Sequence, residues 1–386
     1  MATPETKTEA RTIAAHCHCK STRYTVTLPA SILPISAHMC HCARCRYTHG
    51  TLCIFHAPLP TGVHPNFSGS ATTTPTTTRY FRDGFLGDRR FCTTCGCHVG
   101  DYVESLDMWY IATAPFPKDE TVFLIDEHLY TRSAPAGLYD WLPSIGPARK
   151  LRITNPEDGS AEPEIPEAEF GAVDGEDRLR CECHCGGVSF TIRRPPPLAV
   201  TTTAGDGAGG DGNEDEVAVA VRECASPVHP RRWKAVVDAC NDCRLVNGVH
   251  VGAWAYVPLA MCEPGIGPDL QIGTSKTYAS SPGTLRSFCG VCGATVFYYH
   301  PRHRLEEHGA EGEGKRHDGV VRISVGVFRA PEGVRADSWL TWRTSEISGL
   351  RAGCAYDREY FESLNEGVRN WGVQQYSELV DFSIPY

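Results

Sequence analysis

Three cysteines stand close together in the segment MCHCARC: Cys40, Cys42 and Cys45. Cysteine thiols can form a disulfide, act as a redox pair or bind a metal as thiolates. The chain has 19 cysteines in 386 residues. In a reducing compartment, clustered cysteines more often bind metal or do chemistry than form disulfides. We therefore interpret this cluster as a metal site, and the fourth ligand becomes the question.

The cysteine motifs occur twice along the chain, in the same order. The first half carries HCHCKSTRYTVTL, CHCARCRYTHG and RRFCTTCGCHVG, and the second carries ECHCGGVSFTI, DACNDCRLVNG and RSFCGVCGATVF. Cys45 and Cys92 are 47 residues apart, and Cys243 and Cys289 are 46 apart. The order and spacing predict a tandem repeat, whose second copy is lengthened by a Gly/Asp-rich insertion at 201–216.

In each copy a Cys-x-Cys pair and a distant Cys-x-x-Cys pair supply four thiolates, a set that suits tetrahedral zinc. These outer groups are Cys17, Cys19, Cys92 and Cys95 in the first copy, and Cys183, Cys185, Cys289 and Cys292 in the second. Unrelated buried cysteines would not repeat this spacing. Because four protein ligands leave no open position, we predict structural zinc sites. Gly96 and Gly293 follow the second pairs and predict tight turns whose backbone N–H groups approach the sulfurs.

The central cluster then has only three local thiolates, Cys40, Cys42 and Cys45. Three protein ligands plus a water or substrate is the pattern of a catalytic zinc. A thiol substrate would be a natural fourth ligand, because zinc stabilises its thiolate. In the second copy the equivalent residues are Asp238, Cys240 and Cys243. Aspartate can bind zinc through oxygen, so this second site either keeps a metal or is vestigial.

The remaining cysteines and histidines near these motifs have less specific spacing. We expect His41, Cys53 and Cys97 to pack rather than bind metal, and Cys181, Cys224, Cys262 and Cys354 to be structural. His49 and His56 follow the triplet and could act as a base, although a core or surface position is commoner for histidine. The sequence therefore identifies no general base.

The elements that must position these motifs are mostly strands. Short runs rich in β-branched and aromatic residues, bounded by turn residues, predict strands at 23–28, 187–192, 253–259, 294–299 and 320–328. We expect each cysteine pair at the end of a hairpin. Helical spacing of Tyr360, Phe361, Leu364, Val368 and Trp371 predicts one helix over 357–372, with this face packed on the core.

The domain division follows from the repeat and from an acidic segment between the copies. Residues 155–177 include nine acidic residues, three prolines and no Lys or Arg, which is typical of a solvated linker. We predict domain 1 at 12–150, a linker at 151–178 and domain 2 at 179–386, with insertions near 200–220 and 301–319. The second insertion is charged and contains glycine, so a loop is expected despite its histidines.

Bulk composition narrows the classes of function. The hydrophobic share of 41% permits a sizeable core, and the net charge of −9 argues against a nucleic-acid partner. No apolar run long enough to span a membrane is present, so no membrane partner is expected. The N-terminal residues lack the pattern of a secretory signal, and we expect a cytoplasmic protein.

Together, the motifs CHC…CHCARCR…FCTTCG and CHCGGVSF…CNDCR…FCGVCG resemble the glutathione-dependent formaldehyde-activating enzyme family, which also includes centromere protein V. The two copies cover nearly the whole chain outside the linker, and a double copy with acidic insertions is similar to fungal members. The resemblance implies a mainly β, zinc-bound, Mss-four-like fold for each copy. It also implies carbon–sulfur lyase chemistry, in which the sulfur of glutathione adds to formaldehyde or leaves it.

Residue by residue, the resemblance implies structural zinc on the two outer groups and a second zinc on Cys40, Cys42 and Cys45. In the second copy it carries over fully only to Cys240 and Cys243, since Asp238 departs from the all-cysteine pattern. The central motif ends in a CRxxxG pattern. Arg46 and Gly50 fit it in the first copy, and Arg244 and Gly248 fit it in the second. Lys20 replaces the glycine after the first pair, so the first turn of copy one is expected to differ.

Two functions remain open at this point. One is a zinc-dependent lyase for a thiol–aldehyde adduct such as S-hydroxymethylglutathione, with a small glutathione-like thiol as its partner and domain 1 as the active copy. The other is a non-enzymatic, zinc-stabilised binding module, since function belongs to sites rather than to folds. A Cys-x-x-Cys oxidoreductase is disfavoured because no βαβ context surrounds any pair.

Overall fold

A computed structural model gives the fold of residues 9–68, 76–82, 87–156, 177–197, 216–300 and 319–385. Within these ranges the chain is mainly β, as predicted. Most of the predicted linker and of the insertions at 201–216 and 301–319 lies outside the described residues. The boundaries drawn between the domains therefore stay a prediction.

The first half is built on an eight-stranded sheet. In spatial order its strands are β13 (Arg152–Thr154), β10 (Phe123–Leu129), β3 (Ile35–Cys40), β4 (Ile54–Pro58), β9 (Met108–Ala112), β8 (His98–Val103), β7 (Asp88–Cys92) and β6 (Thr77–Tyr80). A smaller sheet contains β1 (Ala10–His16), β2 (Arg23–Pro29) and β5 (Asn66–Phe67), and β11 (Ser144–Ile145) pairs with β12 (Arg149–Lys150).

The second half repeats this plan. Its large sheet runs, in spatial order, through β23 (Leu340–Trp342), β16 (Trp233–Asp238), β17 (Gly252–Pro258), β22 (Val320–Ser324), β21 (Thr295–Tyr299), β20 (Thr284–Cys289) and β19 (Ser275–Ser281). The small sheet contains β14 (Arg178–Glu182), β15 (Ser189–Arg193) and β18 (Cys262–Glu263). β10 runs parallel to β3, and β23 runs parallel to β16. The matching strand order confirms the tandem repeat.

Four α-helices accompany the sheets in the described residues: α1 (Ala43–His49), α2 (Glu216–Cys224), α3 (Asn241–Asn247) and α4 (Leu350–Tyr376). α1 and α3 are equivalent, because Cys42 and Cys240 cap their N-termini by accepting the N–H groups of Cys45 and Cys243. α4 contains the predicted helix and begins earlier, with a non-helical residue at Asp357. Of its predicted core face, Tyr360, Phe361, Leu364 and Val368 are buried, and Trp371 is half-buried.

Four of the five predicted strands are confirmed, and the fifth is correct only in part. β22 ends at Ser324, and Val325–Val327 form a short 3-10 turn instead of continuing the strand. Gly326 packs against the backbone of the first half here, since a Cβ at this position would lie 2.0 Å from the N atom of Thr51. This contact between the halves cannot be read from local propensity.

Reciprocal contacts join the two halves. The ring of His18 bonds to the hydroxyl of Tyr278 at 2.8 Å, and that of His184 bonds to Tyr80 at 2.7 Å. The N–H groups of these two histidines donate to carbonyl oxygens of the opposite half, at Leu245 and Tyr47. Because His18 and His184 occupy the same place in the repeat, the halves pack like the two subunits of a symmetric dimer.

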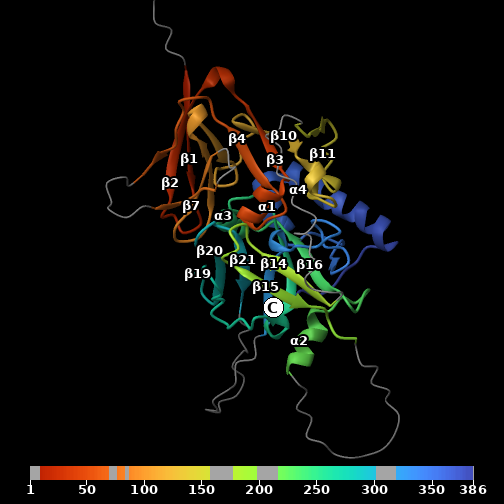
Figure 1. Cartoon of the computed structure of the whole chain (residues 1–386). Coiled ribbons are helices and arrows are strands. Elements are labelled where there is room, and N and C mark those ends of the chain that lie inside the picture. Colours follow the sequence, from red (N-terminus) through yellow and green to blue (C-terminus); the bar gives the residue numbers. More distant parts are fainter. Residues whose placement is uncertain are drawn as a thin grey trace, which may run out of the picture.

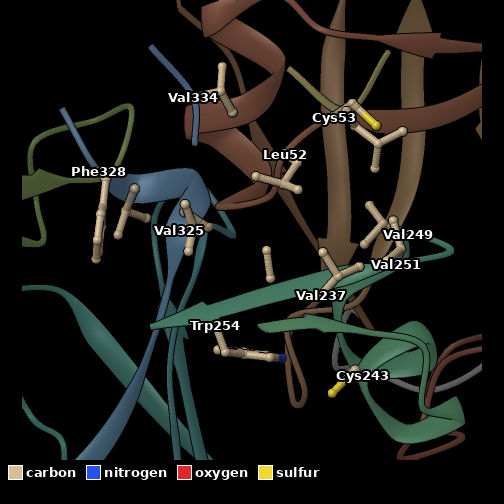
Figure 2. Packing of buried hydrophobic residues seen from close by; sticks show 14 of the residues in the cluster. Leu52, Cys53, Val237, Cys243, Val249, Val251, Trp254, Val325, Phe328 and Val334 are labelled. Carbon is tan, nitrogen blue, oxygen red and sulfur yellow. The ribbon is translucent and has the colours of Figure 1, made fainter. Parts of the chain in front are cut away.

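One hydrophobic core extends through both halves. Figure 2 shows Leu52 and Cys53 of the first half in the same cluster as Val325 and Val249 of the second. α4, blue in Figure 1, extends beside β11 of the first half. There the ring of Trp141 packs edge-on against that of Trp371 at 5.5 Å.

In the part of the chain that the structure describes, no helix is long and apolar enough to cross a membrane.

Candidate metal centres and pocket

The first outer group forms where two hairpin turns meet. Cys17 and Cys19 lie between β1 and β2, and Cys92 and Cys95 lie at the turn between β7 and β8. Their ligand atoms lie within 4.8 Å of one another. The Sγ atom of Cys17 is 3.4 Å from that of Cys19 and 3.7 Å from that of Cys92. These separations are too long for a disulfide of about 2.05 Å and near the roughly 3.8 Å expected around tetrahedral zinc.

The second outer group has the same arrangement between β14 and β15 and between β20 and β21. Cys183, Cys185, Cys289 and Cys292 again lie within 4.8 Å of one another. The N–H of Val188 donates to the sulfur of Cys183 at 3.3 Å, as that of Thr22 does to Cys17 at 3.4 Å. Backbone donors aimed at sulfur favour thiolates, so both donor sets fit a metal that binds four thiolates.

The turns around these groups overturn one expectation and confirm another. Lys20 adopts a left-handed conformation with φ of 61°, as Gly186 does with φ of 74°. The expected difference between the first turns is therefore wrong: a Cβ at Gly186 would meet nothing within 4 Å, so a side chain fits at this turn and costs only left-handed backbone strain. The tight turns at Gly96 and Gly293 are confirmed by their positive φ. The glycine N–H groups donate to the carbonyls of Cys92 and Cys289, and in the second turn the N–H groups of Val291 and Cys292 approach the sulfur of Cys289 at 3.4 and 3.5 Å, as predicted.

The central group of the first half gathers where β3 meets α1. Cys40 ends β3, Cys42 caps α1 and Cys45 lies in its first turn. The three sulfurs lie within 4.8 Å of one another and are buried, and this set includes no fourth ligand among the described residues. Hydrogen bonds from Cys40 and Cys42 hold the pKa of Cys45 well below its usual range. The donor set fits a metal that takes three thiolates and keeps one position open.

A buried arginine connects this group to the neighbouring strands. Arg89 of β7 donates from Nη2 to the sulfur of Cys45 at 3.3 Å, and its Nη1 pairs with Oδ2 of Asp101 at 3.3 Å. Burial raises the pKa of Asp101 to about 7, although Arg89 opposes this shift. Oδ2 of Asp101 also lies 3.6 Å from Nδ1 of His56. A chain of polar groups therefore runs from Cys45 to His56.

All three central cysteines line one pocket of about 220 Å³. Its other walls come from His38, Arg44, Ile54, His56, Gly87, Arg89, Asp101, Val103, Tyr110, Leu129 and Tyr130. Strand pairing explains why the polar residues share one face: His38 pairs with His56, Arg89 with Asp101, and Asp101 with Tyr110. The arrangement can present an open metal position and proton-carrying side chains to one small molecule.

The second half also brings its central residues together. Asp238, Cys240 and Cys243 have ligand atoms within 4.8 Å of one another. One carboxylate oxygen of Asp238 accepts the N–H of Cys240 at 2.8 Å, and the other lies 3.6 Å from the sulfur of Cys243. Arg286 donates to Cys243 at 3.5 Å, in the same way as Arg89 donates to Cys45. The scaffold of the centre is therefore retained.

Aromatic side chains replace two polar pocket residues in this second centre, His56 and Asp101. The strand pairs Val236–Trp254, Arg286–Tyr298 and Tyr298–Arg322 occupy the positions of His38–His56, Arg89–Asp101 and Asp101–Tyr110. The ring of Trp254 is fully buried and lies 5.8 Å from that of Tyr298. Arg286 and Arg322 both stack on Tyr298 at 4.2 Å. Bulky rings thus occupy the positions of His56 and Asp101.

The other predicted residues lie outside the metal groups of the described chain. His41 is buried and bonds through Nε2 to His128 at 2.8 Å. Cys53 belongs to the core, Cys97 packs beside the first outer group, and Cys181, Cys224 and Cys262 are buried. Cys354 is half-buried in α4. This placement agrees with the expectation that these residues pack rather than bind metal.

Several pocket residues were not predicted. Arg89 had a signal, because RRFC and RSFC place an arginine three residues before Cys92 and Cys289 in both copies. No sequence signal pointed to His38, Asp101 or Tyr110, because their proximity depends on sheet register rather than on a motif.

Comparison with known families agrees with the resemblance for the first half. Residues 12–133, about a third of the chain, match the family model described as glutathione-dependent formaldehyde-activating enzyme. The first half therefore carries a domain of this family. No curated protein matches the chain.

Proposed function

We propose that the chain is a zinc-dependent carbon–sulfur lyase that acts on a thiol–aldehyde adduct such as S-hydroxymethylglutathione, at the centre of the first half. The observation that carries this proposal is the group of Cys40, Cys42 and Cys45, which supplies three thiolates at the wall of a pocket. Zinc held by these residues would stabilise a bound thiolate or polarise a carbonyl oxygen. The family of the matched segment supports the same chemistry.

The size of the pocket suggests how a glutathione-like thiol would bind. Its volume of about 220 Å³ is below the roughly 300–1,000 Å³ of pockets that enclose a drug-sized ligand. The reacting sulfur and carbon would therefore enter, while the charged ends of the tripeptide stay at the mouth. Arg44 lines the pocket and supplies a positive charge for a carboxylate. Ile54, Val103 and Leu129 give the pocket apolar walls that limit access of water.

Arg89 would keep the centre in its reactive form. Its hydrogen bond to Cys45 favours the thiolate and fixes the position of α1 relative to β7. Its second contact, to Asp101, holds the opposite wall of the pocket. Both interactions are buried, where charge-assisted hydrogen bonds contribute more than they do at a surface.

A matched pair of variants tests this function. Cys42→Ser and Cys240→Ser change equivalent helix caps, and serine keeps the capping hydrogen bond in both. Loss of metal from the first centre removes several kcal/mol of transition-state stabilisation, on the order of 10³-fold in rate. Exchange spectroscopy of glutathione with formaldehyde would measure this loss. We expect it in Cys42→Ser, and a nearly native rate in Cys240→Ser.

Metal content separates the proposal from its alternative. Zinc per chain, compared between the native protein and Cys40→Ser, should fall by one as the first centre is lost. A chain that holds this zinc and yet catalyses no exchange would be a zinc-stabilised binding module. Equal losses of activity in Cys42→Ser and Cys240→Ser would contradict the assignment to the first half.

A further inference from the structure

His56 is a buried histidine of the pocket that the metal group does not use. It lies on β4, its side chain is 1% exposed, and it lines the same pocket as Cys40, Cys42 and Cys45. Nδ1 lies 3.6 Å from Oδ2 of Asp101, whereas Nε2 is buried without a hydrogen-bond partner in the described chain. A buried polar atom without a partner is costly and is often kept for function.

The surroundings of His56 favour a neutral imidazole at rest. Burial holds its pKa well below the usual range, and the nearby charge of Cys45 opposes this only in part. The titratable and charged groups around it come from four elements: Cys45 and His49 of α1, His38 of β3, Arg89 of β7, and His98 and Asp101 of β8. A neutral imidazole with an unpaired Nε2 can accept a proton.

The second half gives an independent comparison. Strand register places Trp254 at the position of His56 and Tyr298 at that of Asp101. The half with three central cysteines therefore also has the histidine–carboxylate pair. The half with Asp238 in its centre lacks both members of the pair. If His56 served only to fill the core, an aromatic residue would suffice in both halves.

The other two histidines near the triplet fit this task less well. His49 is not among the pocket-lining residues; its Nδ1 lies 3.1 Å from the carbonyl of Cys45, and its ring stacks on His98 at 3.5 Å. His38 lines the pocket but is half-buried, and the carboxylates that act on it, Glu127 and Asp126, are not among the pocket-lining residues. A base held by a third group is the arrangement found in activated nucleophile sites.

We propose that His56 is the proton-transfer residue of this pocket and that Asp101 is the residue that positions it. This proposal rests on the proposed lyase function. When a thiol enters, Nε2 accepts the S–H proton, and the thiolate remains. The thiolate then attacks the carbonyl carbon: a C–S bond forms, the C=O π pair moves to oxygen, and that oxygen takes the proton back from Nε2. Cleavage of the adduct follows the same steps in reverse.

Kinetics of three variants give the first test. His56→Gln should lower kcat by about 10²–10⁴-fold, the usual contribution of general acid–base catalysis. It should also abolish the acid limb of the pH profile, while zinc per chain and thermal stability stay close to native. Asp101→Asn should lower kcat less and shift that limb. His64→Gln is a control, because His64 pairs with Asp107 away from the pocket lining.

Proton counting gives a second test that needs no turnover. Glutathione is titrated into the zinc-loaded chain at pH 7, by calorimetry in buffers of different ionisation enthalpy. Native protein should release close to no proton, because the thiolate formed beside His56 is a negative charge that favours the protonated imidazole, whereas His56→Gln should release close to one. Equal release in both, or a change in His38→Gln instead, would overturn the proposal. A native chain without lyase activity would refute the proposed function, and the proton count would still decide whether His56 accepts the proton.

Discussion

The two central groups share one scaffold and differ in their surroundings. In the first half, three cysteines adjoin a pocket whose polar wall includes His56 and Asp101. In the second, the equivalent strand positions hold Trp254 and Tyr298. Both halves keep a cysteine as the helix cap, and in both an arginine donates to the last cysteine of the group, Cys45 or Cys243. We infer that folding preserves the scaffold, whereas chemistry depends on the few positions that face the pocket.

The largest expected effect concerns the outer groups, which do not differ between the halves. Cys95→Ser or Cys292→Ser removes one of the four thiolates that would hold a structural zinc, and the binding of such a zinc contributes on the order of 10 kcal/mol to folding. Both variants should therefore unfold at much lower temperature than the native chain. Calorimetry together with zinc analysis measures this. A small effect from only one variant would show that the outer sites are not equivalent.

The next prediction concerns a change of one ligand in the second centre. Asp238→Cys restores three thiolates beside Cys240 and Cys243, and soft ligands bind zinc well. We expect the second centre of this variant to retain one zinc against a chelator more strongly than the second centre of the native chain does.

The same substitution in a Cys42→Ser background should stay as inactive as Cys42→Ser alone. Trp254 and Tyr298 occupy the positions that the polar groups hold in the first half. Restored turnover would mean that three thiolates suffice without the polar wall. That outcome would contradict the importance we give to the difference between the centres.

An intermediate loss of stability is expected when a contact between the halves is disturbed. A Cβ at Gly50, where φ is +69°, would lie 2.0 Å from the backbone oxygen of Thr295. Gly50→Ala should destabilise the chain by about 2–4 kcal/mol in urea unfolding, because left-handed strain adds to a clash with backbone. Gly186→Ala is the matched control, since φ is +74° and nothing lies within 4 Å. It should cost only about 1–2 kcal/mol.

Equal costs at Gly50 and Gly186 would show that backbone strain alone explains the loss. A larger cost at Gly50 would support the interpretation that each half is stabilised by the other, as in a dimer.

The grouping of the cysteines could be predicted from the sequence, because the spacing within each pair is local and occurs twice. Cys17 and Cys19, for example, are brought to Cys92 and Cys95 by hairpin turns that the strand pattern already predicts. The pocket was not predictable in the same way. His38, His56 and Asp101 become neighbours through the register of four strands, β3, β4, β9 and β8, which no single segment encodes. The expectation for Lys20 was wrong because the open space at the equivalent turn, seen at Gly186, depends on the tertiary fold.

The smallest predicted effect is the pH dependence of stability that Asp101 contributes. Burial raises its pKa to about 7 in the folded chain, whereas an unfolded aspartate titrates near 3.9. The folded state thus binds this proton more tightly, so the stabilisation is complete below about pH 4 and is lost as pH rises through about 7. Between pH 5.5 and 7.5, native protein should lose about 1–2 kcal/mol relative to Asp101→Asn.

Tyr298 supplies the control for that measurement in the second half. Burial raises its pKa above the usual tyrosine value, so it stays neutral throughout this range. Tyr298→Phe should therefore leave the slope of unfolding free energy against pH unchanged, whereas Asp101→Asn flattens it. If both variants changed the slope alike, the pH dependence of stability would arise from the core that both halves share. If only Asp101→Asn does so, the pH response is confined to the half that has the polar pocket, as the comparison of the two centres requires.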